Sequence, residues 1–193
     1  KGWYKNYIKT MLNHVNVYTG VAYKDDPTIF AWELANEPRS TDNLATKGTV
    51  YDWAKEMSEY VKSIDSNHMV SVGDEGCLRY DSNNKEDMQM LEDLGVNFNW
   101  TNWGGGMGTD FERMLSIETI DFATPHLYLK DWSFSETDAK AWLKLHGEIA
   151  QEYNKPIILE EFGWKKEDAG TAFDSKDDLF EVVYDIIDRK SVV

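Results

Sequence analysis

The 193-residue sequence has few of the features that mark several large classes of protein. Cysteine occurs once, at Cys77, so no disulfide can form within the chain. No apolar run approaches the roughly 20 residues of a membrane span, and no basic and then apolar leader opens the chain, so no membrane partner is expected. The 20 Lys and Arg residues are outnumbered by 35 Asp and Glu residues, which gives a net charge of −15. That balance argues against a nucleic-acid partner, because phosphate binding requires a basic face.

Metal-binding and phosphate-binding motifs are also missing. The four histidines, at positions 14, 68, 126 and 146, show neither His-x-x-x-His spacing nor a cluster with cysteine. The glycine-rich stretch at 104–108 lacks the Lys-Ser/Thr of a phosphate-binding loop. We therefore expect no metal site and no cofactor.

Aromatic residues are abundant, with 8 Trp, 10 Tyr and 8 Phe. Aromatic rings stack on sugar rings, but they are also buried where helices cover a barrel. Composition alone leaves both interpretations open.

Two apolar stretches of strand length end in carboxylates. Residues 28–35 run into Asn36-Glu37-Pro38, and residues 156–161 end in Glu160 and Glu161 before Phe162-Gly163. In α/β folds the chemistry lies at the carboxyl ends of parallel strands, so Glu37 and Glu161 are the candidate catalytic residues. Glu160 competes with Glu161, but side chains alternate along a strand and only one of the two is expected to face the site.

Strands and helices alternate along the whole chain. Amphipathic helices are predicted over roughly the first 15 residues, around Trp53 to Ile64, after a capping box formed by Ser135 and Asp138, and around Leu179 to Ile187. Further strands are predicted at 68–73 and 120–128, and Thr109 is expected to cap a short helix. The stretch 80–108 looks irregular. The pattern fits either a four-stranded doubly wound sheet or an interior segment of a (β/α)8 barrel.

Other polar residues follow the same strand ends. His126 and Tyr128 are two positions apart and therefore share a face of their strand, whereas Glu75 and Trp132 lie just beyond strand ends. These side chains could support a carboxylate or contact a sugar, although each could equally be an ordinary core or strand-end residue.

Taken in order, these stretches resemble glycoside hydrolase family 5, and within it the endo-β-1,4-mannanase branch. The resemblance rests on YKDDP at 23–27, WELANEPR at 32–39, GDEG at 73–76, HLY at 126–128 with Trp132, and ILEEFG at 158–163. It covers essentially the whole chain and assigns the four strands to strands 4–7 of a TIM barrel. It implies an incomplete (β/α)8 barrel: residues 1–193 would be a single catalytic-domain fragment that lacks strands 1–3 and 8.

The resemblance also implies roles for individual residues. Glu37 would be the general acid/base and Glu161 the nucleophile of a retaining double displacement. Asn36 and Arg39 would bind substrate, His126 and Tyr128 would flank the nucleophile, and the substrate would be a β-mannan or glucomannan. The full-length enzyme would be a secreted, extracellular monomer, since a polymeric substrate cannot enter cells. Three alternatives remain: a family 5 endo-glucanase, a non-catalytic carbohydrate-binding barrel remnant, and a plain four-stranded α/β domain.

Overall fold

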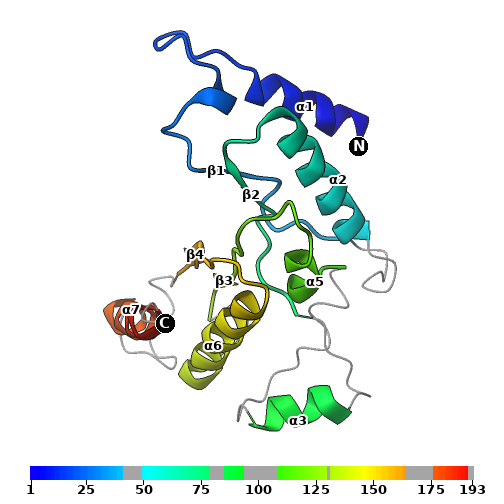
Figure 1. The fold of residues 1–193 in the computed structure, drawn as a ribbon. Coiled ribbons are helices and arrows are strands. Elements are labelled where there is room, and N and C mark those ends of the chain that lie inside the picture. Colours follow the sequence, from blue (N-terminus) through cyan, green and yellow to red (C-terminus); the bar gives the residue numbers. More distant parts are fainter. Residues whose placement is uncertain (41–48, 79–84, 94–107, 130, 164–175, 191–193) are drawn as a thin grey trace.

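The computed structural model describes residues 1–40, 49–78, 85–93, 108–129, 131–163 and 176–190. Helices and strands alternate along the chain as the sequence predicts (Figure 1). The helices are α1 (Gly2–Leu12), α2 (Thr49–Ile64), α3 (Lys85–Asp93), α5 (Phe111–Leu115), α6 (Glu136–Glu152) and α7 (Lys176–Lys190), with a 3-10 turn η1 at Tyr23–Asp25. The strands are β1 (Ala31–Glu33), β2 (Met69–Ser71), β3 (His126–Leu127) and β4 (Glu161–Phe162).

The four strands form two parallel pairs. Strand β1 pairs with β2, with Trp32 opposite Val70, and β3 pairs with β4, with His126 opposite Glu161. Backbone hydrogen bonds also join the stretch that contains β2 to the stretch that leads into β3. The amide of Asp121 donates to the carbonyl of Val70, and the amide of His126 donates to the carbonyl of Glu75. The strands therefore lie in chain order, as consecutive strands of a (β/α) barrel do.

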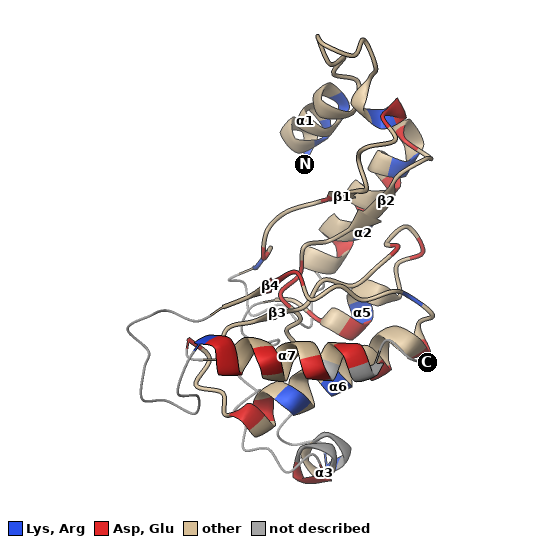
Figure 2. Ribbon diagram, turned by 90° about the vertical axis from the view of Figure 1, so that its left-hand side faces the viewer, with Lys and Arg blue, Asp and Glu red and all other residues tan. Residues whose placement is uncertain are grey.

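The core lies between these strands and the helices that cover them. Met57 and Val61 of α2, Phe111 and Met114 of α5, and Trp142 of α6 are at most 2% exposed and belong to one hydrophobic cluster. Helix α7 packs beside α6, and Leu179 and Val183 are fully buried on its inner face. Acidic residues recur along α7, in keeping with the strongly negative sequence (Figure 2).

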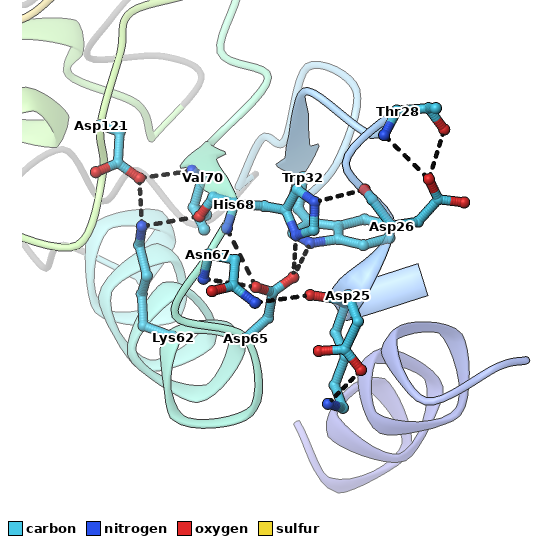
Figure 3. A network of polar contacts seen from close by, with 11 residues as sticks. Asp25, Asp26, Thr28, Trp32, Lys62, Asp65, Asn67, His68, Val70 and Asp121 are labelled. Atoms are coloured by element: carbon cyan, nitrogen blue, oxygen red, sulfur yellow. Dashed lines mark hydrogen bonds and ion pairs between the residues drawn. The ribbon is translucent and has the colours of Figure 1, made fainter. Parts of the chain in front are cut away.

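A polar network holds together the amino ends of β1 and β2, opposite the ends that carry Glu37 and Glu75 (Figure 3). Asp65 is 1% exposed and accepts hydrogen bonds from the indole of Trp32, the backbone amide of Asn67 and the ring and amide of His68. The second ring nitrogen of His68 lies 2.9 Å from the carbonyl oxygen of Asp26. This network joins the entry to β1 to the entry to β2.

The structure corrects three sequence predictions. Residues 85–93 form helix α3, although the stretch 80–108 was expected to be irregular; its other residues before 108 lie outside the described part of the chain. The cap of α5 is Asp110, whose carboxylate accepts from the amide of Arg113, and not Thr109. The paired strands are two or three residues long, shorter than the apolar runs that contain them. The capping box of Ser135 and Asp138 is confirmed.

Several apolar side chains are exposed in this chain. Trp3 is 92% exposed, Phe30 is 65% exposed, and Ile157 and Ile158 are each 38% exposed. None of the helices in the described residues is long and apolar enough to cross a bilayer.

Candidate active site

The ends of β1, β3 and β4 bring Glu37, His126 and Glu161 together. One oxygen of each carboxylate and one nitrogen of the imidazole all lie within 4.8 Å of one another. The close approach of Glu37 and Glu161 that was expected from their positions at strand ends is therefore confirmed. Retaining glycosidases place their two carboxyl groups about 5–5.5 Å apart, and inverting enzymes separate them by more than about 6.5 Å.

Glu37 reaches this position through an unusual backbone. Its φ is +45°, in the left-handed region that side-chain-bearing residues rarely adopt, and its amide donates to the carbonyl of Gly73 at 2.8 Å. Gly73 itself has a φ of +77°, and a Cβ placed there would lie 2.2 Å from the carbonyl oxygen of Ala35. The turn after β1 therefore requires a glycine at position 73, just beyond the end of the neighbouring strand β2.

Arg39 links two carboxylates in the site. Its guanidinium donates to both oxygens of Glu75, at 2.9 and 2.8 Å, and its Nη2 also donates to Oε2 of Glu37 at 3.1 Å. The Glu75 side chain is only 3% exposed, whereas Arg39 is 44% exposed. A two-pronged ion pair of this kind fixes the orientation of both groups.

His126 stands between the two candidate catalytic carboxylates and is fully buried. Its Nδ1 lies 2.9 Å from Oε1 of Glu37 and 3.6 Å from Oε2 of Glu161. Glu161 also accepts a 2.8 Å hydrogen bond from the hydroxyl of Tyr128. This bond, followed by burial and by the charges of neighbouring carboxylates, raises the pKa of Tyr128 to about 12. Tyr128 therefore remains a hydrogen-bond donor throughout the pH range in which proteins fold.

Another carboxylate, that of Glu160, approaches His126 from its other side. Oε2 of Glu160 lies 3.7 Å from Nε2 of His126, a nitrogen that is buried without a hydrogen-bond partner. Burial, and then the hydrogen bond and charge of Glu33, raises the pKa of Glu160 well above that of an ordinary carboxyl. Glu161 faces the site as expected, but the alternation of side chains does not remove Glu160 from it. Glu33 was missed, although it lies four residues before Glu37 and hence on the same face of an extended strand.

Helix α6 supports the site from behind. Trp142 donates its indole N–H to the carbonyl of His126 at 3.0 Å, and the ring nitrogens of His146 lie 2.7 Å from the carbonyl oxygens of Trp142 and Gly76. Burial lowers the pKa of His146 to about 4, so the ring is neutral at ordinary pH and donates to one of these two carbonyls. These contacts hold the backbone of His126 and the loop of Glu75 to a single helix.

The remaining predicted residues lie near these groups. Asn36 is exposed between β1 and Glu37. Trp132 is half-buried, with its ring centroid 6.3 Å from that of Tyr128 and 5.2 Å from that of Trp142 in edge-to-face contacts. Asp74, which was not predicted, is buried beside Glu75, and burial raises its pKa to about 7.

Comparison with known proteins identifies the family. A family model described as GH family 5 beta-mannosidase-like matches residues 1–104 and 101–192. The chain belongs to glycoside hydrolase family 5. Mannan endo-1,4-beta-mannosidase 1 of Arabidopsis thaliana is 39% identical over 198 residues, covering 97% of this chain and 45% of that protein. Mannan endo-1,4-beta-mannosidase 1 of rice (Oryza sativa subsp. japonica) is 40% identical over 191 residues, covering 95% of this chain and 41% of that protein.

Solved structures of this family show the same fold. The hyperthermostable endo-1,4-beta-D-mannanase of Thermotoga petrophila RKU-1 superposes with a TM-score of 0.80 at 36% identity, covering 97% of this chain and 50% of that one. The endo-1,4-beta-mannanase of Rhizomucor miehei gives a TM-score of 0.77 at 37% identity, covering 97% and 49%. This family 5 chain is thus an incomplete (β/α)8 barrel with strands 4–7, and it spans less than half the length of the curated relatives that it matches.

Proposed function

We propose that the protein containing this chain is an endo-β-1,4-mannanase, and that residues 1–193 are one piece of its catalytic domain. The observation that carries this proposal is the close approach of Glu37 and Glu161, whose facing oxygens lie within 4.8 Å although they come from the first and last of the four strand segments. That spacing suits a retaining mechanism, in which the second carboxylate attacks the sugar directly and no water has to fit between the two.

Each carboxylate has a distinct role in this mechanism. Glu161, oriented by Tyr128, attacks the anomeric carbon while Glu37 protonates the departing glycosidic oxygen. Glu37 then removes a proton from the water that releases the sugar from Glu161, and the configuration is retained.

The surrounding residues fit substrate binding. Asn36, next to Glu37 in the chain, would hold the sugar beside the scissile bond, and Arg39, which donates to Glu37, would contact the leaving-group side. Glu75 holds Arg39 in place, His126 holds Glu37, and the half-buried Trp132 offers an aromatic face to a sugar ring. The substrate is a β-mannan or glucomannan, and the relatives from Arabidopsis and rice are named as mannan-cleaving enzymes. As that substrate is an extracellular polymer, the full-length enzyme is secreted, and we expect it to be a monomer.

The proposal is tested by comparing mannan with cellulose as substrates of the full-length protein. We expect mannan to be cleaved internally with retained anomeric configuration, measured by proton NMR of the first product. The E37Q and E161Q variants should each lose at least about a hundredfold to ten-thousandfold in rate.

The matched control is E59Q, a change at an exposed glutamate of α2, which should leave the rate unchanged. Faster cleavage of cellulose would replace mannanase by endo-glucanase activity. Mannan binding without any turnover would favour a carbohydrate-binding barrel remnant instead.

A further inference from the structure

The cluster that would cleave sugars also has the donor atoms of a metal site. Glu37 and Glu161 each offer a carboxylate oxygen and His126 offers Nδ1, all within 4.8 Å of one another. A tetrahedral Zn²⁺ with bonds of about 2.0–2.2 Å holds its donors about 3.4 Å apart. The imidazole nitrogen lies 3.6 Å from Glu161, close to that value, and 2.9 Å from Glu37, a hydrogen bond that the ion would replace.

The three donors combine one fixed group with two adjustable ones. His126 is fully buried, its backbone amide donates to Glu75, and its carbonyl accepts from Trp142. The side chains of Glu37 and Glu161 are 24% and 33% exposed. Rotation of these carboxylates can bring their oxygens into place around an ion, and their exposed side leaves a fourth position to water.

Outer contacts orient the donors as they do in established metal sites. Tyr128 donates to Glu161, and Arg39 donates to Oε2 of Glu37, which leaves Oε1 directed at His126. Behind the ring, the unpartnered Nε2 of His126 faces Glu160 at 3.7 Å. In established metal sites a carboxylate hydrogen-bonded to the far nitrogen of a histidine ligand orients the ring. Glu160 occupies that side of the ring of His126 but does not hydrogen-bond to it.

The charge around the cluster also favours a cation. Three carboxylates, those of Glu37, Glu160 and Glu161, lie within 3.7 Å of the imidazole nitrogens, while the guanidinium of Arg39 is shared between Glu37 and the buried Glu75. A neutral polysaccharide does not balance this charge, whereas a divalent cation does.

We propose that Glu37, His126 and Glu161 form a binding site for a divalent transition-metal cation, represented by Zn²⁺, and that the ion and the substrate exclude each other. No local motif indicates this site, because its ligands come from three separate strand ends. The bound ion occupies the lone pairs that Glu161 needs for attack and that Glu37 needs for proton transfer. Binding is independent of the proposed mannanase activity, whereas the inhibition rests on it.

Binding is tested on the full-length protein with Zn²⁺ by calorimetry and with Co²⁺ by visible absorption. We expect one ion per chain, with the intense absorption of four- or five-coordinate Co²⁺ that includes a nitrogen ligand. Changes outside the ligand shell typically weaken metal binding about 10–100-fold, so E161A and H126N, which remove a ligand, should weaken it by more than about a hundredfold. The control is H14Q, a change at an exposed histidine remote from the cluster, which should bind as the wild type does.

Two results would overturn the site: wild type that takes up no Zn²⁺ at millimolar concentration, or E161A and H126N proteins that bind as tightly as wild type. E161A changes a partly exposed side chain, so it remains informative if H126N fails to fold. Mannan should raise the apparent Zn²⁺ inhibition constant of the active protein, and inhibition insensitive to mannan would overturn the exclusion. If the protein binds Zn²⁺ but cleaves no mannan, the proposed function fails while the metal site stands.

Discussion

Tyr128 donates its hydroxyl to Oε2 of Glu161 across 2.8 Å, so the candidate nucleophile carries a neutral donor at its side. A hydrogen bond to a charged group contributes about 1.5–3 kcal/mol, and each 1.4 kcal/mol corresponds to about tenfold in rate. We therefore expect Y128F to lower kcat/KM on mannan roughly tenfold to a hundredfold, with little change in melting temperature. The exposed Tyr18, changed to Phe, is the control. An unchanged kcat/KM in Y128F would show that this bond does not act in the reaction.

Gly73 is expected to be irreplaceable for a steric reason. In G73A the new Cβ meets the carbonyl oxygen of Ala35 at 2.2 Å with φ at +77°, so the turn that orients Glu37 must shift. We expect a loss of stability of about 1–3 kcal/mol or more and a larger relative loss of activity, measured by urea unfolding and by mannan hydrolysis.

The matched control for G73A lies in helix α6. Gly147 has nothing within 4 Å of an added Cβ, so G147A should stabilise the protein by about 0.5–1 kcal/mol. Equal effects of the two changes would contradict the steric argument.

The pair of Arg39 and Glu75 is expected to contribute to stability as well as to binding. R39A leaves Glu75, which is 3% exposed, without its partner. Loss of one member of a buried pair costs about 3–5 kcal/mol, and we expect about 1–3 kcal/mol because Arg39 is partly exposed. Thermal unfolding measures the change. The control K140A breaks the exposed ion pair with Glu136 and should change the free energy of unfolding by less than about 0.5 kcal/mol. A loss of stability in R39A no larger than that in K140A would refute the expectation.

The His68 and Asp65 pair predicts how stability depends on pH. Burial lowers the pKa of His68, but hydrogen bonds to Asp65 and the Asp26 carbonyl outweigh it and raise the pKa above 6.5. Burial raises the pKa of Asp65, but hydrogen bonds from Trp32, Asn67 and His68 outweigh it and lower the pKa below 3.8. The stabilisation from His68 is thus complete below about pH 6.5 and fades as pH rises through its raised pKa. That from Asp65 is complete above about pH 3.8 and fades as pH falls through its lowered pKa.

We therefore expect wild type to exceed H68Q in stability by about 1–2 kcal/mol near pH 5, with the difference shrinking above neutral pH. Urea unfolding of both proteins from pH 4 to 9 measures it. H14Q, at an exposed histidine, should show no such trend. If the stability difference between wild type and H68Q grew with pH instead, the ion pair of His68 and Asp65 would be excluded.

The sequence predicts the order of elements well and their extents less well. The apolar run 28–35 predicts a strand buried on both faces, but only Ala31–Glu33 complete a hydrogen-bonded ladder and Phe30 is 65% exposed. Helix α3 was missed because its residues carry no wide apolar stripe, and the glycines that suggested irregular structure lie outside 85–93. At α5, Thr109 and Asp110 are both good caps, and only coordinates distinguish them.

The sequence predicts the site only in part, because some of its contacts depend on how the elements pack. Glu37 and Glu161 each follow a strand, so their meeting follows from any fold that aligns strand ends. The support from Trp142 and His146 depends on how α6 packs, and no local pattern encodes it. Glu33 and Glu160 look like solvated carboxylates in the sequence, and the contacts of Glu160 with Glu33 and with His126 emerge only in the folded chain.

The contact between His126 and Glu37 makes the histidine ring sensitive to the proton on Glu37. A neutral imidazole carries one ring hydrogen, so Nδ1 accepts from Glu37 when that carboxyl is protonated and must donate when it is ionised. The tautomer of His126 would therefore alternate between the two halves of a catalytic cycle. Nitrogen-15 labelling of this single ring would turn it into an internal indicator, readable by NMR, of where the catalytic proton resides at each stage.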